Sequence, residues 1–191
     1  SFTLLGATGG VIQMVNHGLV TGALFLLVGM LYERRHTRMI ADFGGLARSL
    51  PRYSVVFMIV VLASVGLPGL NSFVGEFLIL SGAYEPYPVA VVISALGIIL
   101  AAVYLLWMVE RVFFGPVKEE NSGLKDLIHR EWLAIVPMIV LMIWLGIYPK
   151  PFLDKIEPSV DKLVKDYKTA LVEFENAPIE FNEERFEEVT E

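Results

Sequence analysis

The sequence predicts an all-α integral membrane protein with four membrane-spanning helices, one of them discontinuous, followed by an amphipathic helical tail. Hydrophobic residues make up 55% of the 191 residues and the mean hydropathy is +0.61. Soluble domains are only about 45–50% apolar. The apolar residues gather in runs close to or above the ~20 residues that a helix needs to cross a bilayer. One run is interrupted near its middle by glycine and proline, which predicts the discontinuity.

The charges are divided unevenly between the apolar part and the tail. The formal net charge is −6. Residues 1–148 hold nine acids and nine bases, whereas the residues from Pro149 onward hold twelve acids and six bases. There is no basic patch of the kind that binds nucleic acid. Cysteine is absent, so these residues contain no disulfide or thiolate metal site. No signal peptide is visible, and we expect the chain to be a piece of a longer protein.

The first predicted span covers residues 7–32, and its first half is polar on one side. The polar residues follow each other at offsets of 0, 3, 4 and 8, which places them on one face of a helix; they are Gln13, Asn16, His17 and Thr21. Gly18 and Gly22 form a G-x-x-x-G pattern, which permits close approach of another helix. We therefore expect this span to be buried against neighbouring helices.

The basic connector 33–52 follows, with five arginines against two acids, so the positive-inside rule places it in the cytoplasm. The next span, 53–80, then runs outward, and the connector 81–88 without a base suits the outer side. Two further spans complete the membrane domain of residues 1–150, at about 89–114 and 132–148, joined by a second basic loop.

The span 53–80 carries the strongest functional signal. Gly66, Pro68 and Gly69 predict a break at 66–69, and Glu76 follows among apolar residues. Within a bilayer, non-helical backbone and a carboxyl group persist only where they are buried in protein or line a wet cavity. Half-helices that meet near the bilayer midplane are a device of ion transporters. The pattern therefore indicates part of an ion pathway.

Two residues are candidates for proton relay, and each has a purely structural alternative. A carboxyl in hydrocarbon tends to keep its proton or to find a cation, which suits Glu76 for a relay; otherwise it only bonds a polar neighbour. Imidazole can accept a proton on one nitrogen and release one from the other, which suits His17; otherwise it is a packed side chain. Gln13, Asn16 and Thr21 could hold water beside it. No metal-ligand spacing, phosphate-binding loop or nucleophile–base pair is evident, so we expect no cofactor or metal in this chain.

The tail, residues 151–191, is predicted to be amphipathic and acidic. Apolar residues recur at three- and four-residue steps from about Pro158 to Glu175. The last dozen residues are strongly acidic, and we expect them to be disordered.

Four segments resemble the antiporter-like membrane subunits of respiratory complex I (NADH-quinone oxidoreductase): GGVIQMVNHGLVTGALFLLVGMLYERRHTR, FGGLARSLP, LASVGLPGLNSFVGEFLIL and YLLWMVERVFFGP. The resemblance covers about residues 1–150 and is closest to subunit M, the ND4 type. It implies that the spans are the last four of fourteen and that residues 62–80 form the discontinuous helix of the second inverted repeat. It also implies that His17 and Glu76 lie on the hydrated axis and outer half-channel for protons. Glutamate at position 76 favours the M type, since the sister subunits usually carry lysine there.

Three hypotheses of function follow. The first is a non-redox, proton-translocating subunit of NADH:quinone oxidoreductase, a multi-pass protein of a bacterial-type cell membrane whose partners are neighbouring antiporter-like subunits and the lipid bilayer. The second is a subunit of an Mrp-type Na⁺/H⁺ antiporter, or the membrane subunit of a related hydrogenase complex. The third is a scaffold in which Glu76 and His17 only pack.

Overall fold

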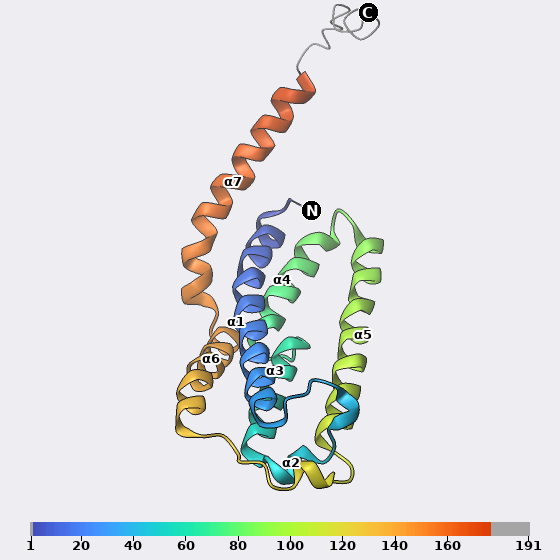
Figure 1. Ribbon diagram of the computed structural model, residues 1–191. Helices are drawn as coiled ribbons and strands as arrows, with labels where there is room; N and C mark the ends of the chain where they lie inside the picture. The colour runs from blue at the N-terminus through green and yellow to red at the C-terminus, as the bar shows by residue number, and fades with distance from the viewer. Residues whose placement is uncertain (1, 177–191) are drawn as a thin grey trace, which may run out of the picture.

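The computed structural model describes residues 2–176, and among these residues all regular structure is helical. Seven α-helices follow each other along the chain (Figure 1): α1 (Leu4–Arg35), α2 (Leu46–Ser49), α3 (Pro51–Ser64), α4 (Asn71–Tyr84), α5 (Pro88–Phe113), α6 (His129–Ile147) and α7 (Lys150–Asn176). Two 3₁₀ turns, η1 (Ile40–Asp42) and η2 (Glu119–Asn121), lie in the connectors. The all-α architecture predicted from the sequence is confirmed.

The long helix α1 is the centre of the bundle. It packs against α3, α4, α6 and α7, while α5 lies at the edge beside α3 and α4 (Figure 1). The hydroxyl of Thr3 caps its first turn by accepting a hydrogen bond from the Gly6 N–H at 3.1 Å. At the other end His36 adopts a left-handed conformation and its N–H donates to the Tyr32 carbonyl. By length and composition α1, α5 and α6 could each cross a membrane.

The segment predicted as the broken span consists of two half-helices, so the predicted discontinuous helix is present. α3 ends at Ser64 and α4 begins at Asn71, and each has 14 residues, which is short for a span on its own. Residues 65–70 form the turn between them. Gly66 and Gly69 have φ values of +79° and +94°, a region that side chains with a Cβ rarely adopt. The predicted break at 66–69 falls within this turn.

The helix α1 uses a different surface for close packing from the one that its G-x-x-x-G pattern predicts. A Cβ built on Gly18 would meet nothing within 4 Å, and one on Gly22 would meet only the end of the Met138 side chain at 3.2 Å. Close approach occurs instead at Gly75 of α4, where a Cβ would lie 3.0 Å from Cα of Gln13. Gly22 does lie close to α6 through Met138, whereas no described residue lies against Gly18, for which close approach stays a prediction. The glycine spacing permits close contact, but the buried stripe of α1 faces α4 from another side of the helix.

The tail helix α7 begins earlier than the amphipathic pattern indicates. It starts at Lys150 and includes Pro151 and Pro158. Proline is tolerated in the first turn, because no N–H is needed there, whereas Pro158 removes one hydrogen bond within the helix. Val160 and Val164 are buried. The disorder predicted for the end of the tail concerns residues 177–191, which lie outside the described part of the chain.

Candidate functional site

Glu76 lies on α4, and its carboxyl group is folded back onto the turn between the half-helices. A Cβ built on Gly66 would lie 2.3 Å from Oε2 of Glu76, so the carboxyl group rests directly against the glycine backbone. The positive φ of Gly66 and this close approach both require glycine at that position. The break and the acid, which the sequence placed ten residues apart, are thus one site.

The carboxyl group of Glu76 opens into a cavity of about 300 Å³ between α3, α4 and α5. Most of the lining is apolar, and the hydroxyls of Ser64 and Ser94 are the polar side chains that share it with Glu76. This volume has room for several water molecules, since each takes about 30 Å³ in the liquid. A carboxyl group in a partly polar cavity with room for water can exchange a proton with its surroundings.

The polar stripe of α1 divides into two parts. Asn16 is completely buried and turns toward α4, and its Nδ2 lies 3.4 Å from Oε1 of Gln13. His17 lies on the exposed side of α1, where its ring nitrogens are 3.4 Å from the Thr21 hydroxyl. Among the described residues no hydrogen bond joins His17 to Glu76. The structure therefore brings His17 together with Thr21, and Gln13 together with Asn16, but leaves the two relay candidates on different helices without a hydrogen bond between them.

A pair of asparagines links α1 to the start of α4, and the sequence analysis did not single out Asn71. The Asn16 side chain donates to the Asn71 carbonyl at 2.8 Å, and the Asn71 side chain donates to the Asn16 carbonyl at 3.4 Å. Both residues are 0% exposed. Because Asn71 is the first residue of α4, the pair attaches the second half-helix to α1 next to the break.

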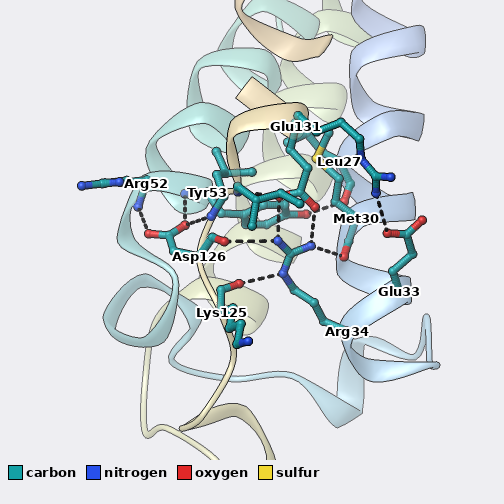
Figure 2. Close-up of polar contacts among 12 residues, drawn as sticks. Leu27, Met30, Glu33, Arg34, Arg52, Tyr53, Lys125, Asp126 and Glu131 are labelled. Carbon is teal, nitrogen blue, oxygen red and sulfur yellow. Dashed lines mark hydrogen bonds and ion pairs between the residues drawn. The ribbon is translucent and has the colours of Figure 1, made fainter. Parts of the chain in front are cut away.

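At the end of α1 that is remote from its N-terminus, a buried ion pair forms the clamp, which we define as Arg34, Asp126 and Glu131 (Figure 2). The two terminal nitrogens of Arg34 each donate to Glu131 at 2.7 Å. The remaining N–H groups of the guanidinium donate to the backbone carbonyls of Met30, Lys125 and Asp126. Arg34 and Glu131 are only 13% and 6% exposed. Each of the five guanidinium N–H groups therefore has its own acceptor oxygen, so the buried charge is fully hydrogen-bonded.

The third member of the clamp, Asp126, caps α3. Its carboxylate accepts from the backbone N–H groups of Arg52 and Tyr53 at 2.9 and 3.0 Å (Figure 2). The Tyr53 hydroxyl in turn donates to the Leu27 carbonyl of α1 at 2.8 Å. The clamp thus joins α1, α3 and α6. Sequence reasoning treated Arg34 only as a positive-inside charge, since its partner Glu131 lies 97 residues away and nothing local signals the pair.

Residues 2–176 contain no group of three or more His, Cys, Asp or Glu side chains arranged to hold a metal ion. The site consists of a broken helix with a carboxyl group in a cavity at the break, and the clamp holds the bundle at the end of α1. Bundles with such a discontinuous helix and a buried ionisable group are typical of ion-transporting membrane proteins.

Comparison with known proteins agrees with that class. The family model described as "NADH:quinone oxidoreductase/Mrp antiporter, TM" matches residues 1–113. The chain belongs to this family and is a membrane protein.

Several relatives are similar over most of this chain. NADH-quinone oxidoreductase subunit M of Mycobacterium tuberculosis (strain ATCC 25618 / H37Rv) is 44% identical over 159 residues, which cover 83% of this chain and 29% of the relative. NADH-ubiquinone oxidoreductase chain 4 of Marchantia polymorpha is 45% identical over 170 residues, covering 88% and 34%. The chain therefore spans about a third of the length of these curated relatives.

Two solved structures resemble the fold. A chain of respiratory complex I from Thermus thermophilus with bound NADH superposes with a TM-score of 0.81 at 37% identity, covering 86% of this chain and 34% of that one. A chain of the Mrp complex from Dietzia sp. DQ12-45-1b has a TM-score of 0.71 at 20% identity, covering 85% and 38%. The second likeness concerns the fold alone.

Proposed function

We propose that this chain is part of a proton-translocating membrane subunit of NADH:quinone oxidoreductase, of the M or ND4 type. It moves protons and carries out no redox chemistry itself, so it needs no cofactor of its own, and electron transfer takes place in other subunits. Its partners are neighbouring membrane subunits and the lipid of a bacterial-type cell membrane, which it crosses several times.

One observation carries the proposal: the carboxyl group of Glu76 lies against Gly66 at the break of a membrane-spanning helix and faces a cavity. A carboxyl group in an apolar setting exchanges protons readily when water reaches it. The relatives named above, at 44% and 45% identity, support NADH:quinone oxidoreductase over an Mrp-type antiporter, for which the support is a shared fold.

The test uses two substitutions of Glu76 in the assembled complex. Glu76→Gln keeps the volume and hydrogen-bonding capacity but cannot exchange a proton. Glu76→Asp keeps the chemistry with a shorter reach. Inverted membrane vesicles report proton uptake by quenching of an acid-sensitive dye, and NADH oxidation is measured in parallel at matched subunit abundance. The control is Glu85→Gln, which removes an exposed acid directly after α4.

A relay predicts that Glu76→Gln assembles but loses proton transport, that Glu76→Asp keeps part of it, and that Glu85→Gln behaves as wild type. A structural role predicts the reverse order, with glutamine nearly harmless and aspartate worse because of the void it leaves. Wild-type transport by Glu76→Gln would remove Glu76 from the mechanism and favour the scaffold hypothesis.

A further inference from the structure

The last turn of α6 touches the break backbone to backbone. Gly146 is the residue before the end of α6, and a Cβ built on it would lie 2.3 Å from the Gly69 carbonyl oxygen and 2.4 Å from Cα of Leu70. Real Cβ atoms essentially never come this close to backbone. Glycine is therefore the residue that allows α6 to support the turn 65–70 at this distance.

The same turn is held from a second helix. Asn16 of α1 donates its side-chain N–H to the Asn71 carbonyl at 2.8 Å, one residue beyond Leu70, in a fully buried contact. The turn and the start of α4 thus lie between two fixed contacts, Gly146 on α6 and Asn16 on α1. We call these two contacts the seat of the break.

The seat has a direct consequence for Glu76. Gly66, at the start of the turn, is the surface against which the Glu76 carboxyl group rests, and α4, which begins at the end of the turn, carries Glu76 itself. A shift of the turn therefore moves the carboxyl group and its support together. Gly146 and Asn16 can have this effect without donating or accepting the transferred proton.

We propose that Gly146 and Asn16 are positioning residues for proton transfer at Glu76, which they serve by holding the break in place. The proposal rests on the function proposed for Glu76. In this proposal α6 acts through the backbone contact of Gly146 and not through an ionisable group. Asn16 holds the turn in position and does not carry protons along the polar stripe of α1.

The expected size of the effect follows from the distances. Ordinary van der Waals contact for a Cβ is 3.4–4 Å, so Gly146→Ala has to move the turn, or α6, by at least about 1 Å from the 2.3 Å approach. A displacement of this size at a reacting group can lower a rate about a hundredfold. We expect Gly146→Ala to lower the rate of proton transport at least tenfold, within that hundredfold limit.

Asn16→Leu tests the other side of the seat without adding a methyl group at a backbone contact. It removes the hydrogen bond to Asn71 while keeping a side chain of similar size. The Asn16 Oδ1 atom accepts no hydrogen bond from the described residues. Replacing Asn16 by leucine therefore leaves no hydrogen-bond donor of these residues without an acceptor. The matched control is Gly29→Ala in α1, where a new Cβ would meet nothing within 4 Å.

A second readout follows the turn directly. The 191 residues contain no cysteine, so Leu67→Cys introduces a unique thiol into the turn, at a side chain that is 44% exposed. In the assembled complex its rate of reaction with a small membrane-permeant maleimide is read by mass spectrometry on the peptide that carries residue 67. We expect both Gly146→Ala and Asn16→Leu to change this rate at least threefold, and Gly29→Ala to leave it unchanged.

The two readouts together decide the proposal. A changed labelling rate with reduced transport, in either seat variant that assembles, supports it. An unchanged rate, with or without a loss of transport, overturns it, as does a changed rate with wild-type transport. Normal transport by Glu76→Gln would defeat the proposed function, whereas the labelling rate would still report whether the seat holds the turn.

Discussion

The clamp allows the sharpest prediction on stability, because the structure supplies both a buried ion pair and an exposed one for comparison. Arg34→Met removes the guanidinium and leaves the Glu131 carboxylate, only 6% exposed, without its partner. Breaking a buried pair by removing one member typically costs about 3–5 kcal/mol. The backbone carbonyls of Met30, Lys125 and Asp126 lose their donors at the same time. We therefore expect a loss near the upper end of that range.

The double variant Arg34→Met/Glu131→Leu separates the charge from the geometry. Replacing a whole buried ion pair by apolar residues is often neutral or stabilising by about 1–4 kcal/mol. The backbone carbonyls of Lys125 and Asp126 still lack the Arg34 donor in the double variant, so we expect it to recover most, but not all, of the stability lost in Arg34→Met. The two substitutions should be strongly non-additive, with a coupling free energy above about 2 kcal/mol.

The assay is reversible unfolding of the purified subunit in mixed micelles with increasing sodium dodecyl sulfate, compared at constant lipid and temperature. The control is Arg130→Met, because Arg130 and Glu33 form an exposed pair at 3.9 Å with side chains 79% and 68% exposed. Such surface pairs contribute about 0–1 kcal/mol. If Arg34→Met destabilised the subunit no more than Arg130→Met does, the clamp would not be a stabilising element and the reasoning would fail.

Three further predictions follow from the same contacts. Gly66→Ala should assemble poorly or lose proton transport, because its Cβ would lie 2.3 Å from Oε2 of Glu76 and its φ of +79° is costly for alanine; vesicle transport at matched abundance measures this. Asp126→Ala should lower the unfolding free energy by about 1–2 kcal/mol, since two N–H groups at the start of α3 lose their cap, as measured in the same micelles. Cysteines at Thr37 and Tyr84 should react with an impermeant reagent from opposite sides of sealed vesicles; labelling from one side would refute the assigned topology.

The membrane class and the broken helix followed from the sequence, because both depend on local composition. A run of apolar residues is long enough to span a bilayer whatever surrounds it. Proline and glycine interrupt a helix through their own backbones, so the break could be located within the turn that the structure shows between Ser64 and Asn71. The spacing of Glu76 from the break also lay in the sequence, and it identified the acid as the principal candidate.

The sequence could not indicate which face of each helix would meet which neighbour. A helical pattern places Asn16 and His17 on one polar stripe, yet a rotation of 100° between adjacent residues allows one to be buried against α4 and the other to remain exposed. In the same way Gly18 and Gly22 permit close packing, but the buried stripe of α1 brings Gly75 into contact instead. These outcomes depend on the shapes of several helices at once.

What the sequence by itself determined, then, was the helical membrane class, the place of the break and the acid beside it, since each arises from neighbours along the chain. Only the tertiary structure decided that Arg34 pairs with Glu131 across 97 residues, that Gly146 supports the break, and that Glu76 folds back onto Gly66. The physical reason is that burial and hydrogen-bond satisfaction are properties of the packed bundle, in which distant segments supply each other's partners.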